Sequence, residues 1–258
     1  MEAVLRYFST SQDFEIAAFL LLVLVFELWE RSRPARRIDR FADLRLDVLS
    51  FGFALLVNRL STRTVTSSME AVLPDVVLQS LHAMAALPSA LKMLGSIVLA
   101  DFTIYWLHRA QHRYDVLWRT HAWHHSVERL YWFSGFRTSL GHSLMNNIPQ
   151  AAIPLFVFQM SPVEAGITYS IGMLIQFWEH TNVRVNIGLL EYVFITPAYH
   201  RVHHSANELC RTNYGGFLSI WDRAFGTYCD PRTVPEDTPL GLGEHVPARR
   251  IPRMLVGI

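Results

Sequence analysis

Five stretches of the chain carry few charged residues, and polar segments separate them. They cover residues 14–28, 46–60, 93–107, 148–160 and 163–178. A helix needs about 20 apolar residues to cross a bilayer, so several of these stretches are short for a span unless they continue into the interface. Ser161-Pro162 separates the last two stretches and is typical of a turn, which predicts a helical hairpin. The pattern predicts an all-α fold, an integral membrane bundle of about four to five hydrophobic helices.

Basic residues are concentrated in the loop after the first apolar stretch, which holds arginines at 31, 33, 36, 37, 40 and 45. Cytoplasmic loops are enriched in Lys and Arg, so this loop is expected in the cytoplasm. Alternating the spans from there brings the ends of the third and fifth stretches, near His108 and His180, to the same face. The sequence therefore predicts a multi-pass membrane protein with a histidine-rich helical cap on the cytoplasmic side.

Composition narrows the classes of protein that fit. Of the residues, 51% are hydrophobic and only 17% are charged, which is below the roughly 25% charged residues of soluble domains. The net charge of +1 argues against a nucleic-acid partner. Two cysteines, Cys210 and Cys229, are too few for a disulfide framework or for paired-cysteine zinc spacings. Any metal must therefore be held by histidine, with or without carboxylates.

Eight of the twelve histidines fall into three short boxes. These are His108-Arg-Ala-Gln-His112, His121-Ala-Trp-His124-His125 and His200-Arg-Val-His203-His204. Spacings of three and four residues place side chains on one face of a helix, where imidazoles can meet at a metal. A closed zinc site needs only four ligands, so this number of histidines predicts two metal ions. His180, at the end of the last apolar stretch, is expected to be a ninth ligand.

Two further residues are candidates for the site. Asp101 interrupts an apolar stretch, and an ionisable group there is often functional. We expect it to accept an N–H of a ligand imidazole, the alternative being a structural pair with Arg109, Arg137 or another base. His142 could line the site, bind a substrate head group or complete the ligand set, and a position at the membrane interface fits it equally well.

The chain divides into three predicted regions. Residues 1–92 hold the first membrane helices and the basic loop, 93–230 form a catalytic domain, and 231–258 form an extended cytosolic tail. Residues 61–88 are expected to be an interfacial helix or an outer loop. The aromatic residues Trp123 and 131–133 fit either a substrate channel or an interfacial belt.

The histidine boxes and their flanks resemble the fatty acid hydroxylase/sterol desaturase superfamily. The resemblance is carried by Asp101-Phe-Thr-Ile-Tyr-Trp-Leu-His108, by Leu117-Trp118-Arg-Thr-His121, and by Asn213-Tyr214-Gly215 with Trp221-Asp222 after the last box. It runs from about residue 95 to 230. Asn213, Trp221 and Asp222 are expected to brace the C-terminal part onto the site.

The resemblance implies a membrane oxygenase with two non-haem iron ions. The eight box histidines and His180 would be ligands, whereas Arg184 stands where some hydroxylases of the family carry a further histidine. It implies that O2 and electrons are used to hydroxylate or desaturate a lipid such as a sterol or fatty acyl chain. The chain holds no evident redox motif of its own, so a separate donor of the cytochrome b5, ferredoxin or reductase type is expected. The alternative is a membrane metal-binding or metal-transport protein without redox chemistry.

Overall fold

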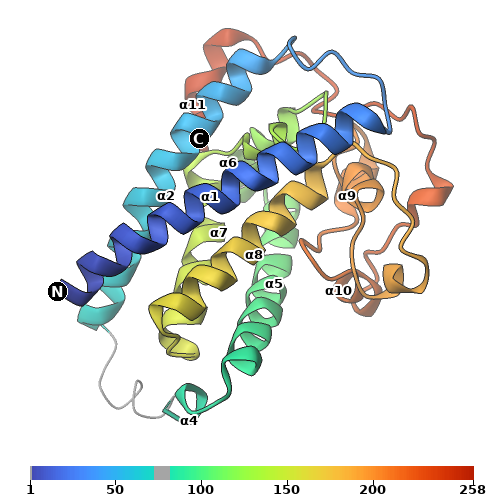
Figure 1. Cartoon of the computed structure of the whole chain (residues 1–258). Helices are drawn as coiled ribbons and strands as arrows, with labels where there is room; N and C mark the ends of the chain where they lie inside the picture. The colour runs from blue at the N-terminus through green and yellow to red at the C-terminus, as the bar shows by residue number, and fades with distance from the viewer. Residues whose placement is uncertain (1, 73–81) are drawn as a thin grey trace.

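The computed structural model describes residues 2–72 and 82–258, with the side chains of residues 16–17, 19–60, 64 and 83–258. Helices and loops make up the described residues, and β-structure among them is limited to isolated bridges such as that between Pro34 and Val183. The prediction of an all-α fold is confirmed. Figure 1 shows long helices at one end and short helices joined by loops at the other.

Residues 153–160 of the fourth predicted apolar stretch lie beyond its α-helix, and the five stretches otherwise lie within five helices of the described chain. These are α1 (Glu2–Ser32), α2 (Leu44–Val72), α5 (Ser89–Arg113), α7 (Leu140–Ala152) and α8 (Pro162–His180). A short helix, α4 (His82–Ala85), precedes α5. Helix α1 packs along α8, α2 packs along α7, and α5 contacts both α7 and α8 (Figure 1).

The outer surface of this bundle is apolar. Large exposed hydrophobic side chains include Leu20, Leu24 and Leu28 of α1, Leu49, Leu56 and Leu60 of α2, and Leu91 and Leu94 of α5. Such an extended apolar surface is typical of a bundle embedded in a membrane. Within the described residues, α5 is the one helix that is both long and apolar enough to cross a bilayer by length and composition. Crossing by the other helices stays a prediction.

The predicted hairpin forms, and its sequence explains how. The Ser161 hydroxyl accepts the backbone N–H of Glu164, whose carboxylate accepts the backbone N–H of Ser161, and Pro162 occupies the first turn of α8. This capping box fixes the start of the helix. Glu164 also forms a buried ion pair with Lys92 at 2.7 Å, which ties α8 to α5. The preceding arm ends in a π-helical segment, Ile153–Val157, shortly after Pro149 interrupts the hydrogen bonds of α7.

Short elements form the cap above the bundle. They are α6 (Asp115–His121), η1 (His124–Ser126), η2 (Ser134–Phe136), η4 (Gly188–Tyr192), α9 (Pro197–His203), η5 (Glu208–Arg211) and α10 (Ile220–Ala224). A core of Phe26, Tyr131, Trp132 and Phe177 joins cap to bundle. In this core Trp132 stacks on Phe177 with ring centroids 5.0 Å apart.

Three expectations need correction. Residues 61–72 continue α2 rather than forming a separate interfacial helix or loop, and residues 73–81 lie outside the described part. The aromatic residues Trp123, Tyr131 and Trp132 are buried, so they do not form an interfacial belt, and their place in a channel wall stays a prediction. Trp123 donates its indole N–H to Ser50, which holds the second histidine box against α2.

The C-terminal residues fold back onto the cap instead of extending away from it. They contain η6 (Pro231–Thr233), η7 (Ala248–Arg250) and α11 (Ile251–Val256), and α11 contacts α6 and α7. Leu240 is buried with Val127 and Leu130. Burial of such apolar side chains stabilises the folded-back path, which the Pro- and Gly-rich composition did not indicate. The boundaries of the three predicted regions stay a prediction.

Candidate metal centre

The nine histidines predicted as ligands lie in two buried clusters. The first cluster contains His108, His112, His121, His125 and His203, and the second contains His124, His180, His200 and His204. Within each cluster one ring nitrogen per residue lies within 4.8 Å of the others. The clusters adjoin, because the rings of His125 and His204 stack with centroids 4.6 Å apart.

Both HxxHH boxes are shared between the clusters. His124 belongs to the second cluster while its neighbour His125 belongs to the first, and His204 and His203 are divided in the same way. Consecutive residues on a helical backbone point about 100° apart, so adjacent imidazoles reach different points. The HxxxH box, by contrast, lies wholly in the first cluster.

The Nε2 atoms converge within each cluster. In the first cluster, Nε2 of His121 lies 2.8 Å from that of His108 and 3.1 Å from that of His125. In the second cluster, Nε2 of His200 lies 3.1 Å from those of His180 and His204. Imidazoles bound at about 2.1 Å to one ion, at right angles, place their nitrogens roughly 3 Å apart. The separations therefore fit a shared metal ion in each cluster.

Backbone carbonyls select the tautomer that leaves Nε2 free. His108 donates from Nδ1 to the Tyr214 carbonyl at 2.8 Å, and His203 donates to Thr212 at 2.8 Å. His124 donates to the Arg137 carbonyl at 3.0 Å. A histidine whose Nδ1 carries the proton presents the lone pair of Nε2 to a metal. His180 donates in the same way to the Gln176 carbonyl at 3.0 Å. The four contacts serve histidines of both clusters.

His142 lies outside the two clusters, but it contacts His121 of the first and stacks on His124 of the second with ring centroids 5.2 Å apart. Its Nδ1 is 2.9 Å from Nδ1 of His121, and its Nε2 is 2.9 Å from the side-chain amide of Asn146. The atom of Asn146 nearest to His142 Nε2 is the amide nitrogen Nδ2. If His121 uses Nε2 as a ligand, its Nδ1–H donates to His142, and the Nε2–H of His142 then requires the Asn146 amide to be turned so that its oxygen accepts. His142 is therefore positioned to orient a ligand rather than to bind metal.

Burial keeps the imidazoles of the cap neutral. Desolvation is the main cause that lowers the pKa of His125 and of His204 well below the usual 6.5, and the neighbouring imidazoles lower both further. The pKa of His121, of His200 and of His203 is lowered well below 6.5 in the same way. Neutral imidazole is the form that binds metals, and it prevails here at neutral pH.

Arg137 and Glu179 are site residues that the sequence did not single out. The Arg137 guanidinium forms a buried ion pair with Asp47 of α2 and so fixes the loop whose carbonyl holds His124. A Glu179 carboxylate oxygen lies 3.4 Å from Nδ1 of His180. Asp47 and Glu179 each place a carboxylate within or at the end of an apolar helix, a signal that could have identified them.

A glycine is required beside the second cluster. A Cβ atom on Gly135 would lie 2.5 Å from Cγ of His180, closer than any real contact. The Gly135 carbonyl also accepts the amide N–H of Gln176 at 2.8 Å. The loop at η2 thus approaches His180 closely enough to fix its ring.

Asp101 does not contact an imidazole. It accepts the backbone N–H groups of residues 217–218 at 2.8 and 3.1 Å and the indole N–H of Trp221 at 2.8 Å. Within the described residues its hydrogen bonds come from these three donors, so the expected bond to a ligand and the alternative pair with Arg109 or Arg137 are both wrong. The turn before α10 supplies enough donors to satisfy the carboxylate, and Asp101 anchors that turn to α5.

Asp222 braces the cap as expected. Its carboxylate accepts the backbone N–H groups of Tyr214 at 2.9 Å and Gly215 at 2.8 Å, and the hydroxyl of Thr227 at 2.6 Å. Because the Tyr214 carbonyl holds His108, this network positions a ligand through the backbone. The side-chain oxygen of Asn213 accepts the backbone N–H of Cys229 at 2.7 Å, which closes the same loop.

Arg184 points away from the clusters. Its guanidinium is mostly exposed and forms an ion pair with Glu236 of the C-terminal segment. The position at which some family members carry a histidine is therefore a surface position in this chain, and the second cluster consists of four imidazoles.

Comparisons with known proteins agree on one family. The fatty acid hydroxylase family profile matches residues 93–227. Human alkylglycerol monooxygenase is 29% identical over 231 residues, which cover 88% of this chain and 49% of that protein. Ornithine lipid hydroxylase OlsE of Rhizobium tropici is 29% identical over 252 residues, covering 92% of this chain and 74% of that protein.

A more distant relative is the probable Delta(7)-sterol 5(6)-desaturase of Neurospora crassa, 32% identical over 142 residues that cover 52% of this chain and 37% of that protein. The chain spans about half the length of the human and zebrafish (Danio rerio) alkylglycerol monooxygenases that it matches. No solved structure matches it significantly.

Proposed function

The chain belongs to the fatty acid hydroxylase family, and on this premise we propose that it is a membrane-bound, O2-dependent lipid monooxygenase with two non-haem iron ions. The observation that carries the proposal is the division of nine buried histidines into two adjoining clusters with converging Nε2 atoms. A structural zinc site would need only one such cluster.

The donor set fits two irons. Neutral imidazole is a suitable ligand for iron, and the nine histidines provide it without any carboxylate from the clusters. When bound, the irons would supply the activation of O2 and the oxidation of an unactivated C–H bond, chemistry that amino-acid side chains cannot perform. The first cluster would hold one ion with five histidines and the second would hold the other with four.

The protein supplies geometry and dryness. Backbone carbonyls orient the rings of His108, His124 and His203, and the buried cap keeps bulk water from them. Rigid positioning of this kind determines which substrate carbon reacts. The four-histidine cluster has one imidazole fewer than its neighbour, and this is where we place the opening for O2 and substrate.

We propose monooxygenation rather than desaturation. The relatives that cover most of the chain carry the names monooxygenase and hydroxylase, whereas the desaturase matches about half of it. Ether-linked glycerolipids and ornithine lipids are the substrate classes that these names suggest. The apolar surface of the bundle would allow such a lipid to approach from the membrane, and a separate protein would deliver the electrons.

Metal analysis of protein purified under anaerobic conditions tests the metal assignment. We expect about two iron ions per chain and a Mössbauer spectrum of a coupled pair. Tightly bound zinc at one ion per chain, after expression with ample iron, would contradict the proposal and favour a non-redox metal-binding protein.

A matched pair of variants tests the activity. His124→Ala removes a second-cluster imidazole, and His245→Ala removes an exposed imidazole of the C-terminal segment. Cells producing the unaltered protein or His245→Ala should accumulate a lipid heavier by one oxygen atom, and cells producing His124→Ala should not. A lipid lighter by two hydrogens would make the enzyme a desaturase, and full activity of His124→Ala would refute the assigned site.

A further inference from the structure

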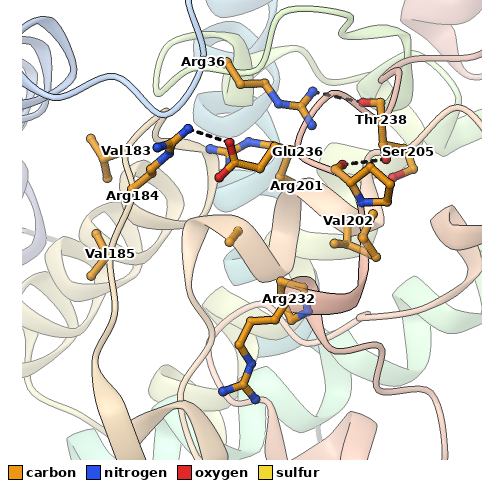
Figure 2. A pocket seen from close by; sticks show the side chains of 14 residues that line it. Arg36, Val183, Arg184, Val185, Arg201, Val202, Ser205, Arg232, Glu236 and Thr238 are labelled. Atoms are coloured by element: carbon orange, nitrogen blue, oxygen red, sulfur yellow. Dashed lines mark hydrogen bonds and ion pairs between the residues drawn. The ribbon is translucent and has the colours of Figure 1, made fainter.

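A cavity of about 410 Å³ lies beside α9, on the face turned away from the histidines. Residues 198, 201, 202 and 205 line it, and helical spacing places them opposite His200, His203 and His204. The loop after α1, the loop after α8 and the C-terminal segment complete the wall (Figure 2). Three distant parts of the chain therefore meet at this cavity.

The lining is strongly basic. It contains four arginines, at positions 36, 184, 201 and 232, and a single carboxylate, Glu236. Arg184 pairs with Glu236, and Arg232 pairs with Asp230 at 2.8 Å. Among the described residues, no carboxylate lies within ion-pair distance of the remaining two guanidiniums, Arg36 and Arg201. Figure 2 shows Arg36, Arg184, Arg201 and Glu236 in the upper half of the view, with Arg232 lower and apart from them.

Three buried donors in the same lining lack an acceptor. They are Nε of Arg36, Nη2 of Arg201 and the hydroxyl of Ser205, none of which has a hydrogen-bond partner among the described residues. Arg36 makes one bond from Nη1 to the Thr238 carbonyl at 3.0 Å. A buried donor without a partner costs about 1–3 kcal/mol, and more when it is charged.

We propose that this cavity binds a phosphate group, supplied either by free phosphate or by the phosphorylated head group of a lipid. Guanidinium groups bind phosphate oxygens with paired, charge-assisted hydrogen bonds, and a hydroxyl adds another donor. A tetrahedral anion with several oxygens can use donors that come from different sides, as Arg36, Arg201 and Ser205 do. The proposal goes beyond the lipid oxygenase and does not depend on it.

Titration of inorganic phosphate into the purified full-length protein tests the proposal, with binding followed by calorimetry in lipid-free maltoside detergent at constant ionic strength. Arg201→Gln should weaken binding about tenfold or more, because it removes charge-assisted bonds. Arg250→Gln is the matched control, since this exposed arginine pairs with Glu244 and lies outside the cavity lining. It should change the dissociation constant by less than about twofold.

Glu236→Gln is a second variant for the same titration. It tests the proposal even if Arg201→Gln disturbs the neighbouring histidines. Removing the one carboxylate of the lining should strengthen phosphate binding several-fold, because the anion no longer meets a like charge. Phosphate binding that is equally weakened by Arg201→Gln and Arg250→Gln, or unaffected by Glu236→Gln, would overturn the proposal. Absence of saturable phosphate binding would also overturn the proposal. Saturable binding of polyglutamate, a polymer of carboxylates, in place of phosphate would overturn it as well.

Reconstitution distinguishes the two sources of phosphate. In nanodiscs of digalactosyldiacylglycerol, a lipid without phosphate, the protein should bind inorganic phosphate as it does in detergent. In nanodiscs of phosphatidylglycerol, loss of that binding would assign the cavity to lipid head groups, and unchanged binding would assign it to free phosphate. Metal content and lipid oxidation enter none of these measurements, so failure here and failure of the oxygenase proposal are separate results.

Discussion

The Nδ1 atoms of His121 and His142 lie 2.9 Å apart, so one of these imidazoles must donate a proton to the other. A ligand role for His121 Nε2 makes His121 the donor and His142 the acceptor. His142→Phe should therefore leave His121 without its orienting partner. Loss of such a contact typically costs 10–100-fold in metal affinity or activity, and we expect a loss of that size in iron affinity, measured by competition with a chelator.

Variants at Asn146 separate orientation from packing. Asn146→Asp places a carboxylate oxygen, which can only accept, beside Nε2 of His142, whereas Asn146→Leu has a similar volume and no acceptor. We expect Asn146→Asp to retain iron affinity within about threefold and Asn146→Leu to lose much of what His142→Phe loses. If all three variants bound iron as tightly as the unaltered protein, His142 would have no orienting role.

Gly135→Ala should disturb the second cluster selectively. The new Cβ would lie 2.5 Å from the His180 ring, which must move or force the η2 loop away. Because that loop also bonds to Gln176 of α8, the cost is expected to be about 1–3 kcal/mol of unfolding free energy. Iron analysis should give close to one ion per chain, in the first cluster. Two ions bound with unchanged affinity would contradict the close packing.

The metal-free protein should lose stability as the pH falls below about 6.5. Burial lowers the pKa of His121, His125 and His204, among other cap histidines, well below 6.5. Below 6.5 the unfolded chain binds protons that the folded chain does not, so the free energy of unfolding decreases as the pH decreases. The loss approaches about 1.4 kcal/mol per histidine for each pH unit.

Thermal unfolding of chelator-treated protein between pH 7.5 and 5.5 measures this effect. His245→Ala, which removes an exposed imidazole outside the two clusters, is the control for the loss of a histidine as such. A flat profile over this range would mean that the clusters accept protons without unfolding.

Asp222→Asn should destabilise the cap. The carboxylate accepts the N–H groups of Tyr214 and Gly215, and an amide nitrogen in place of one oxygen would face a donor. We expect a loss of about 3 kcal/mol of unfolding free energy from the broken charge-assisted bonds. Asp230→Asn removes a partly exposed carboxylate paired with the exposed Arg232 and should cost less than about 1 kcal/mol. Urea unfolding of the two variants under identical conditions compares them, and equal stabilities would remove Asp222 as the brace of the cap.

The helices and the candidate metal ligands could be predicted from local patterns, because the length of an apolar stretch and the spacing of histidines depend only on residues close together in the sequence. The partners of the buried carboxylates could not. Asp101 was expected to accept an N–H of a ligand imidazole, but its donors come from residues 217–218 and Trp221, more than one hundred positions later. Likewise, nothing in the sequence near Arg137 indicates Asp47 as its partner.

The division of each HxxHH box between two clusters has a consequence for how the centre assembles. A single short segment, such as residues 200–204, contributes imidazoles to both clusters, so an ion that captures His200 and His204 also fixes the backbone that carries His203. If each cluster binds an ion as proposed, binding of the first would therefore lower the conformational entropy that remains to be lost when the second binds. Iron loading of this chain is expected to be cooperative, with protein carrying a single ion scarce at every stage of the titration.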